Sequence, residues 1–308
     1  MCIYLKSLNG VAVTDLRSFV YDEHVVTDTR FACGYTLPPV LEKRMSPSSP
    51  VSLPLQLIAD YAFFNAARSL NTPLPSKCER FRFGKAIAIV DPARPGNPMC
   101  NRVLGYCGDT ISHLTEILSL FEEHGQQPQF DISSDDLYPE VVASLIENDI
   151  SAAEAITYLN LAPADVEPGA PIAGVQVESW EEDRADDFLE LLKTSGVTCD
   201  AETWKERRQF YCTETFRTFI ATCDGQACAW ATLYVDENQG LLANAFTLPD
   251  FRNRGCHSAL LRARILDARG LELERIFTDV VAGSQSHQNC RRAGFDNQTV
   301  VTLWKQGG

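Results

Sequence analysis

A stretch rich in proline and glycine lies in the middle of the chain, and it constrains the fold more than any other feature. Residues 162–174 read Ala-Pro-Ala-Asp-Val-Glu-Pro-Gly-Ala-Pro-Ile-Ala-Gly, with three prolines and two glycines in thirteen residues. Such a segment has no periodic apolar face and is typical of a linker. We therefore expect two domains, residues 1–165 and 174–308, each of ordinary size.

Strand and helix patterns alternate after this linker. We expect strands at residues 175–178, 216–223, 227–234, 240–247, 275–281 and 299–305, and helices at 182–195, 201–211, 258–269 and 286–293. The dipeptide Asp224-Gly225 predicts a tight hairpin between two of the strands. The order β-α-α-β-β-β-α-β-α-β predicts an α/β fold in which helices flank a mixed sheet.

The first half has a less regular pattern. Strands are expected at residues 82–90, 102–107, 127–133 and 155–161, and helices at 110–124 and 138–148, with an exposed loop at 45–54. The last part, β-α-β-α-β, repeats the order expected for residues 240–305. A weak internal duplication is the economical explanation of this repeat.

Composition narrows the class of protein. Hydrophobic residues make up 45% and charged residues 22% of the 308, which indicates a globular chain. Because the sequence has neither a long apolar run nor a signal-peptide pattern, we expect a cytoplasmic protein without a membrane partner. The eleven cysteines are scattered, with no C-x-x-C pair, so we expect reduced, buried thiols and no metal.

Charge is unevenly distributed. The net charge of −14 disfavours nucleic acid as a partner. Residues 252–292 nevertheless contain eight arginines against four acidic residues, a local charge of +4. A cationic segment of this kind favours an anionic ligand.

The strongest motif lies within this segment. After the strand expected at 240–247, Pro249 breaks the pattern, and Arg252-Asn253-Arg254-Gly255 leads into a helix. Backbone N–H groups at a helix N-terminus bind phosphates, arginine adds bidentate donors, and Gly255 lets the backbone approach closely. The segment therefore predicts a phosphate-binding loop.

This loop resembles the acetyl-CoA loop of the GNAT superfamily, (Q/R)-x-x-G-x-(G/A), and residues 283–295 resemble the family's fourth helix, which ends in Gly-Phe. The resemblance covers about 130 residues. It implies tandem GNAT-like domains, each a mostly antiparallel mixed sheet flanked by helices, with acetyl-CoA or another acyl-CoA as co-substrate. The residues that it places at the CoA are Phe246, Thr247, Arg252, Asn253, Arg254, Gly255, Cys256, His257, Ser258, Ser284 and Asn289.

Proton-transfer residues depart from the family's pattern. His257 stands where the family usually has glycine or alanine. Asn244 lies near the usual glutamate base, and Cys290 lies where many members have a tyrosine acid. Asparagine cannot take up a proton at neutral pH. Asp279 is a weak alternative base on the next strand, and no committed general base is expected.

The first half lacks a corresponding phosphate loop. At Gly105–Asp109 it has no arginine, and an acid stands where phosphates would lie. We expect this half to be a degenerate GNAT-like domain that forms walls of the substrate pocket.

The resemblance implies an N-acyltransferase in which a small-molecule amine attacks the thioester directly. Two alternatives remain open. One is a GNAT-fold enzyme with a carrier-protein or aminoacyl-tRNA donor, although the first 174 residues, with 12 basic against 21 acidic residues and thus a charge of −9, disfavour tRNA. The other is a non-catalytic tandem protein that binds acyl-CoA.

Overall fold

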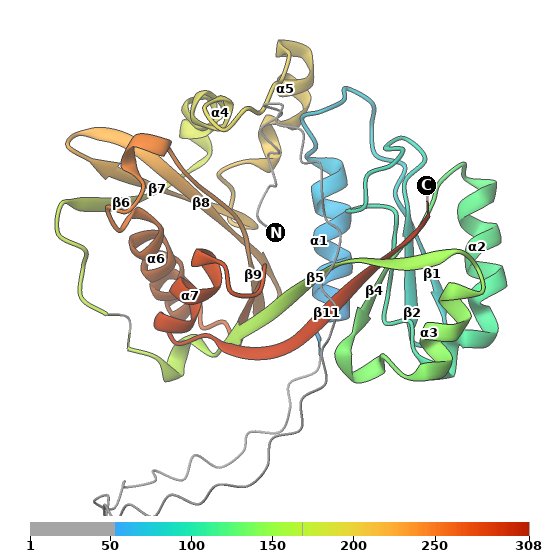
Figure 1. Ribbon diagram of the computed structural model, residues 1–308. Helices are drawn as coiled ribbons and strands as arrows, with labels where there is room; N and C mark the ends of the chain where they lie inside the picture. Colours follow the sequence, from blue (N-terminus) through green and yellow to red (C-terminus); the bar gives the residue numbers. More distant parts are fainter. Residues whose placement is uncertain (1–52, 168, 308) are drawn as a thin grey trace, which may run out of the picture. The chain divides into compact units, whose positions relative to one another are not determined.

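All strands of the described chain lie in one mixed sheet. The computed structural model describes residues 53–167 and 169–307. Eleven strands in this part of the chain follow the order β1-β2-β3-β4-β11-β5-β10-β9-β8-β7-β6 (Figure 1). We call residues 53–161 the N-half and residues 175–306 the C-half.

The N-half contributes three α-helices and five strands. The helices are α1 (Leu55–Ala67), α2 (Leu114–Glu123) and α3 (Pro139–Ile146). The strands are β1 (Glu79–Phe83), β2 (Ala86–Val90), β3 (Arg102–Leu104), β4 (Gln129–Ser133) and β5 (Ile150–Leu161). Short 3₁₀ turns are η1 (Gly108–His113), η2 (Ser134–Asp136) and η3 (Pro163–Asp165).

The C-half contributes the remaining elements. Its strands are β6 (Val175–Trp180), β7 (Phe216–Cys223), β8 (Gln226–Asp236), β9 (Gln239–Thr247), β10 (Arg275–Val280) and β11 (Asp296–Gln306). Its helices are α4 (Ala185–Lys193), α5 (Ala201–Arg207), α6 (Cys256–Gly270) and α7 (Gln285–Arg292). The 3₁₀ turns are η4 (Glu182–Arg184), η5 (Arg208–Phe210) and η6 (Pro249–Phe251).

The last strand of each half pairs with a strand of the other half. β5 pairs antiparallel with β10, and β11 pairs antiparallel with β4. β5 and β11 also pair with each other, from the 150/306 pair to the 160/296 pair, and run side by side in Figure 1. The halves therefore share one hydrogen-bonded sheet through exchanged strands.

The two halves repeat one succession of elements. β2, β3, α2, β4, α3 and β5 in the N-half follow the same order as β8, β9, α6, β10, α7 and β11 in the C-half. Each half contains one parallel pair, β3 with β4 and β9 with β10, whereas the other neighbours are antiparallel. The expected α/β fold with tandem, mostly antiparallel mixed sheets is confirmed.

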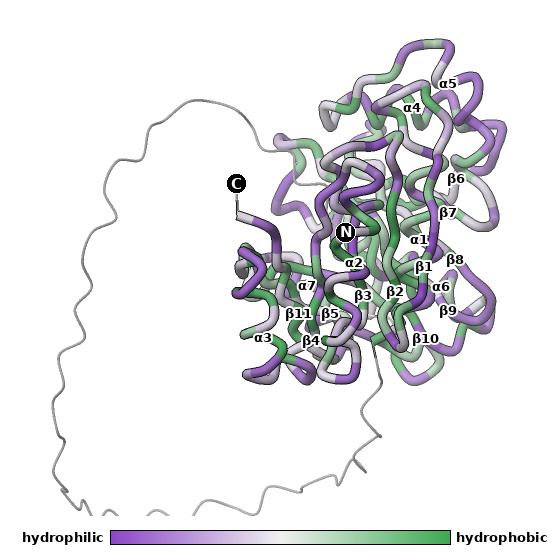
Figure 2. Tube along the Cα trace, turned by 90° about the vertical axis from the view of Figure 1, so that its right-hand side faces the viewer, coloured by the Kyte–Doolittle hydropathy of each residue, from purple (hydrophilic) through white to green (hydrophobic). Residues whose placement is uncertain are grey.

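Helices cover both faces of the N-half. α2 and α3 pack on the alanines and the valine of β2, whereas α1 packs on Ile87 and Ile89, which point to the opposite face. Because successive strand residues point to opposite faces, a strand covered on both sides must be apolar throughout. β2, with the sequence AIAIV, accordingly appears hydrophobic along its length in Figure 2.

The C-half core lies between α6, α7 and strands β7 to β10. The hairpin expected at Asp224-Gly225 is present, and both residues have positive φ, 54° and 77°, as a type I′ turn requires. Among the helices of residues 53–307, none is both long and apolar enough to cross a membrane.

Two local expectations from the sequence are wrong, and one helix was missed. Residues 82–90 form not one strand but the hairpin β1–β2, which turns at Gly84 with φ +61°. The helix expected at 110–124 begins as the 3₁₀ turn η1. Helix α1 was not predicted at all. The loop expected at 45–54 lies almost wholly outside the described residues.

The linker is held along α6. Arg269 donates from Nε to the carbonyl of Pro163 at 3.0 Å and from Nη2 to that of Val166. Arg262, which lies nearer the start of α6 than Arg269, donates from Nε to the carbonyl of Gly169. Two arginines of the cationic segment therefore hold the linker.

Candidate functional site

β9 and β10 separate along their length. These parallel strands pair only over residues 239–241 of β9 and 275–277 of β10. Beyond that point β9 continues on β8 as far as Thr247, and β10 continues on β5 as far as Val280. The two strands thus diverge where an extended ligand can hydrogen-bond to a strand edge.

The predicted phosphate loop follows β9 directly. Asn253 and Gly255 both have positive φ, 63° and 84°, and Gly255 is the N-cap residue of α6 without a side-chain cap. A Cβ atom at Gly255 would lie 2.7 Å from Cγ2 of Ile172 in the linker. The loop geometry therefore requires glycine here, and the first N–H groups of α6 have no side-chain acceptor at the cap.

The loop arginines are exposed. Arg254 forms an ion pair with Asp224 at 3.1 Å, and its guanidinium lies 5.0 Å from the ring centroid of Phe251. Arg252 is held only weakly, with Nε 3.4 Å from the carbonyl oxygen of Thr247. Both guanidinium groups can therefore be recruited by an anion.

Most of the other arginines of the cationic segment have structural partners. Arg264 is buried and donates to the carbonyls of Leu260 and Thr232. Arg275 donates to Asn160, and Arg291 pairs with Asp296. The positive charge counted from the sequence is thus largely neutralised or bound internally, which leaves Arg252 and Arg254 at the loop.

The two sequence motifs meet in the structure. His257, in the first turn of α6, accepts at Nδ1 a hydrogen bond from Asn289 Nδ2 on α7, at 3.2 Å. Ser284 caps α7, its hydroxyl accepting from the backbone N–H of His287 at 3.1 Å. Burial, with the positive charge of Arg264, lowers the pKa of His257 to about 4. His257 is therefore neutral at physiological pH and positions Asn289.

This pKa predicts an effect on stability at acidic pH. Because the folded-state pKa of His257, about 4, lies below the unfolded value, the unfolded state binds more protons. Protonation of His257 therefore leaves the free energy of unfolding unchanged above about pH 6.5 and lowers it by roughly 3 kcal/mol as the pH falls to 4. We expect His257→Gln, which keeps a hydrogen-bonding group for Asn289, to flatten the fall in unfolding free energy between these pH values. Denaturant titrations of both proteins would measure it, and parallel pH profiles would contradict the assignment.

The three weak catalytic candidates lie in different surroundings. Asn244 lies in a β-bulge of β9 and is buried, and its Nδ2 donates to the Tyr61 hydroxyl of α1 at 3.4 Å. Cys290, a residue of α7, is buried in the apolar core of the C-half. Asp279 is half-buried on β10, directly across from Tyr158 of β5. Of the three, Asp279 is therefore the most accessible.

Tyr158 belongs to the same face as Asp279. Burial, followed by the charge of Asp279, raises the pKa of Tyr158 to about 12. Since directly opposed residues of antiparallel strands share a face, Asp279 and Tyr158 lie together where the exchanged strand meets β10. This pair could not be predicted from the sequence, because the pairing of β5 with β10 joins distant segments.

Helix α1 is the largest feature of the site that sequence reasoning missed. Beyond its contact with Asn244, the Tyr61 hydroxyl accepts from Arg68 Nη2 at 3.3 Å. Arg68 Nη1 donates to Tyr211 of the C-half at 3.2 Å, and its guanidinium lies 4.4 Å from the ring centroid of Phe216. The N-half therefore covers Asn244 through a buried polar chain.

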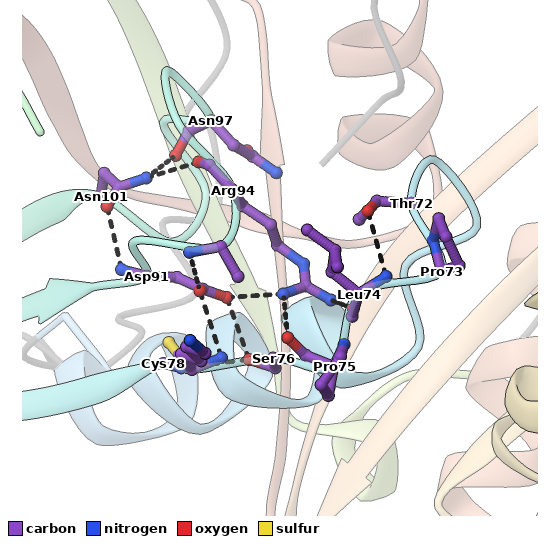
Figure 3. A network of polar contacts seen from close by, with 12 residues as sticks. Thr72, Pro73, Leu74, Pro75, Ser76, Cys78, Asp91, Arg94, Asn97 and Asn101 are labelled. Carbon is purple, nitrogen blue, oxygen red and sulfur yellow. Dashed lines mark hydrogen bonds and ion pairs between the residues drawn. The ribbon is translucent and has the colours of Figure 1, made fainter. Parts of the chain in front are cut away.

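The loop that follows α1 is also held by polar contacts, of which Figure 3 shows those within the N-half. Asp91 accepts from Arg94 Nη1 at 2.8 Å and from the Ser76 hydroxyl at 3.0 Å. Arg94 Nη2 donates to the carbonyl of Leu74 at 3.2 Å. Arg207 of α5 donates to that same carbonyl at 3.0 Å. These contacts tie the α1–β1 loop to the C-half.

The corresponding place in the N-half is built differently. β3 and β4 are bridged by a buried ion pair between Arg102 and Asp131. The loop after β3 leads into η1, where the backbone N–H of Cys107 donates to the Thr110 hydroxyl at 2.9 Å. Asp109 is exposed and pairs with Lys85 at 2.6 Å. An acid thus lies where the C-half places its arginines.

Comparisons with known proteins agree with this geometry. Residues 177–295 match the family model described as the acetyltransferase (GNAT) family. A GCN5-related N-acetyltransferase from Kribbella flavida is similar in structure with a TM-score of 0.59, at 14% identity over 82% of this chain and 95% of that chain. One from Sphaerobacter thermophilus has a TM-score of 0.53, at 15% identity over 73% and 81%.

A tandem GNAT protein from the clavulanic acid biosynthesis pathway also has a TM-score of 0.53, at 12% identity over 82% of this chain and 96% of that chain. At these identities the structural likeness shows the fold. No curated protein sequence matches the chain.

Proposed function

We propose that the protein transfers an acyl group from an acyl-CoA to an amine, starting from the match of residues 177–295 to the model of the acetyltransferase (GNAT) family. The observation that carries the proposal is the unit of β9, loop and α6. It combines a diverging strand edge, two exposed arginines and a glycine with φ +84° at a helix start. A nucleotide pyrophosphate on a pantetheine arm is the ligand that fits such a unit.

The donor would lie along the first turn of α6, the loop arginines and the free edge of β9. Its pyrophosphate would accept hydrogen bonds from the first turn of α6 and from the loop arginines. Its pantetheine arm would pair with β9 beyond the point where β10 diverges. The contacts proposed are Phe246, Thr247, Arg252, Asn253, Arg254, Gly255, Cys256, His257, Ser258, Ser284 and Asn289. Of these, Cys256 is buried and would contribute its backbone.

The chemistry proposed is direct attack in a ternary complex. The nitrogen of the neutral amine attacks the thioester carbonyl carbon, the C–S bond breaks, and CoA leaves as the thiolate, which takes up the proton that the amine nitrogen loses. Positioning and stabilisation of the oxyanion supply much of the rate. Asn244 and Cys290, both buried, are not assigned a proton-transfer role.

A second candidate function is a non-catalytic protein that binds acyl-CoA. The observation that favours it is the covering of Asn244 by Tyr61 of α1. Release of free CoA thiol from acetyl-CoA in the presence of an amine separates the two functions, since binding alone releases none.

The first consequence concerns stoichiometry. Because Arg102 and Asp131 bridge the parallel strands of the N-half, and its loop presents Asp109, we expect one CoA per chain. Isothermal titration with CoA measures this directly. Two sites of similar affinity would contradict the prediction that the N-half is a degenerate domain that does not bind CoA.

The second consequence concerns pH. Without a committed general base, kcat/KM should rise with pH and level off near the pKa of the acceptor amine. Exchanging Asn244 or Cys290 for alanine should lower kcat far less than the factor of about 100–10,000 typical of a lost general acid or base.

Asp279→Asn is the informative comparison for this mechanism. We expect a small effect on kcat at unchanged CoA affinity. A loss of about 100-fold or more in kcat, with folding intact, would instead identify Asp279 as the base. A loss of that size in Cys290→Ala would assign the thiol the acid's role.

A further inference from the structure

Three buried cysteines meet directly beneath the phosphate loop. Cys223, Cys228 and Cys256 are each at most 3% exposed. Sγ of Cys256 lies 3.6 Å from Sγ of Cys223 and 3.7 Å from Sγ of Cys228, and all three sulfurs lie within 4.8 Å of one another. The cluster is separate from the residues proposed to hold the donor, apart from the backbone of Cys256.

Local geometry brings these thiols together from three elements. Cys223 ends β7, and Cys256 is the first residue of α6. Cys228 is the extra residue of a β-bulge, because Ala227 pairs with Thr222 and Ala229 pairs with Ala221. A bulge re-aims the side chain of its extra residue, and here Cys228 reaches the same apolar core as the other two.

Two of the three sulfur separations match those of a tetrahedral thiolate site. With Zn–S bonds of about 2.3 Å, the edge of a tetrahedron is roughly 3.8 Å. Two of the three edges here, 3.6 and 3.7 Å, are within 0.2 Å of that length. Thiolates are the ligands preferred by zinc and by copper(I). The site therefore has the ligand type and nearly the spacing that a thiophilic ion requires.

Charge decides between these two ions. Three thiolates with a divalent ion leave a net charge of −1, whereas with a monovalent ion they leave −2, and buried charge is unfavourable. The remaining negative charge would lie beside the first residue of the 15-residue helix α6, where the helix dipole favours negative charge.

We propose that Cys223, Cys228 and Cys256 bind one zinc ion. On binding, three thiols lose three protons and form three Zn–S bonds, and a water molecule completes the tetrahedron. No fourth cysteine, histidine or carboxylate joins the group among residues 53–167 and 169–307. The proposal goes beyond the expectation, drawn from the absence of a C-x-x-C pair, that the cysteines are reduced, buried thiols without a metal.

Zinc at this position would join the phosphate loop to the β7–β8 hairpin. Cys256 follows Gly255 directly, and Cys223 precedes Asp224, which already pairs with Arg254. The ion would thus hold the start of α6, at the end of the phosphate loop, against the β7–β8 hairpin. Its binding is nevertheless measured without any acyl donor, so failure of this inference and failure of the proposed activity are distinguishable.

The test is cobalt titration of the full chain after zinc has been removed by a chelator under reducing conditions. Cobalt(II) in a tetrahedral thiolate site gives a sulfur-to-cobalt charge-transfer band, which zinc then abolishes. We expect one cobalt per chain. In Cys228→Ala the affinity should fall by more than the roughly 10–100-fold loss that follows removal of a supporting residue around a metal ligand.

The matched control is Cys290→Ala, since Cys290 is equally buried in the same core but lies outside the cluster. It should bind cobalt as the parent does. If Cys228→Ala does not fold, as judged by thermal melting, Cys223→Ser at the end of β7 replaces it. The proposal is overturned if the parent shows no charge-transfer band, if Cys290→Ala loses binding as severely, or if the purified cluster is found as a disulfide instead.

Discussion

Replacing Arg102 by leucine is expected to destabilise the folded protein by about 3–5 kcal/mol, the usual consequence of leaving one partner of a buried ion pair alone. Arg102 on β3 and Asp131 on β4 are 5% and 2% exposed in their side chains. Without the guanidinium, Asp131 keeps a hydrogen bond from Gln129 Nε2 at 2.8 Å but no positive charge. Urea denaturation of both proteins, with the m-value compared, measures the loss.

Two further variants make this result specific. Exchanging both partners for leucine should recover much of the lost stability, because paired buried charges replaced together are often neutral. Lys85→Ala, which breaks the exposed pair with Asp109, should leave the unfolding free energy close to that of the parent, because solvent screens an exposed ion pair. A loss below about 1 kcal/mol in Arg102→Leu would show that the pair does not hold β3 to β4.

Replacing Arg252 and Arg254 together by alanine is expected to weaken CoA binding by about 3 kcal/mol or more, since charge-assisted hydrogen bonds contribute roughly 1.5–3 kcal/mol each. That corresponds to a loss of affinity of at least about 100-fold. Arg254 should contribute the smaller share, because binding must compete with its ion pair to Asp224. Calorimetry on the parent, both single variants and the double variant separates the two contributions.

The control for this variant removes the same charge elsewhere. Arg184 and Arg208 are half-buried near α4 and α5, where they pair with Asp187 and Asp186. Their double alanine variant should keep the CoA affinity of the parent within a few fold. Equal losses in the two double variants would mean that net charge, and not the loop, determines binding.

Local signals in the sequence predicted much of the C-half. The period of the apolar residues marked the strands and helices, and Asp224-Gly225 marked a turn that only residues tolerant of positive φ can form. The loop between β9 and α6 could be predicted equally well, because glycine, arginine and a helix start are adjacent in the chain. Its binding of phosphate stays a prediction. His257 and Asn289 could be named, but their hydrogen bond could not.

Features that depend on distant segments had no such signal. The exchange of β5 and β11 places Tyr158 opposite Asp279, yet nothing in either strand specifies its neighbour. The thiol cluster gathers residues 223, 228 and 256 through a bulge, which leaves no ligand spacing to recognise. Helix α1 was missed although it covers Asn244, because it begins after Pro54 without a side-chain cap and its apolar residues are not confined to one face.

Thiol release is the measurement that tests the central claim most directly. Full-length protein is mixed with acetyl-CoA and pooled small amines, and free CoA thiol is followed over time. The account predicts release that requires both an amine and the enzyme, and that falls in the Arg252→Ala, Arg254→Ala double variant but not in the Arg184→Ala, Arg208→Ala control. Tight binding of CoA with no amine-dependent release from any pool would contradict acyl transfer and leave a protein that only binds the donor.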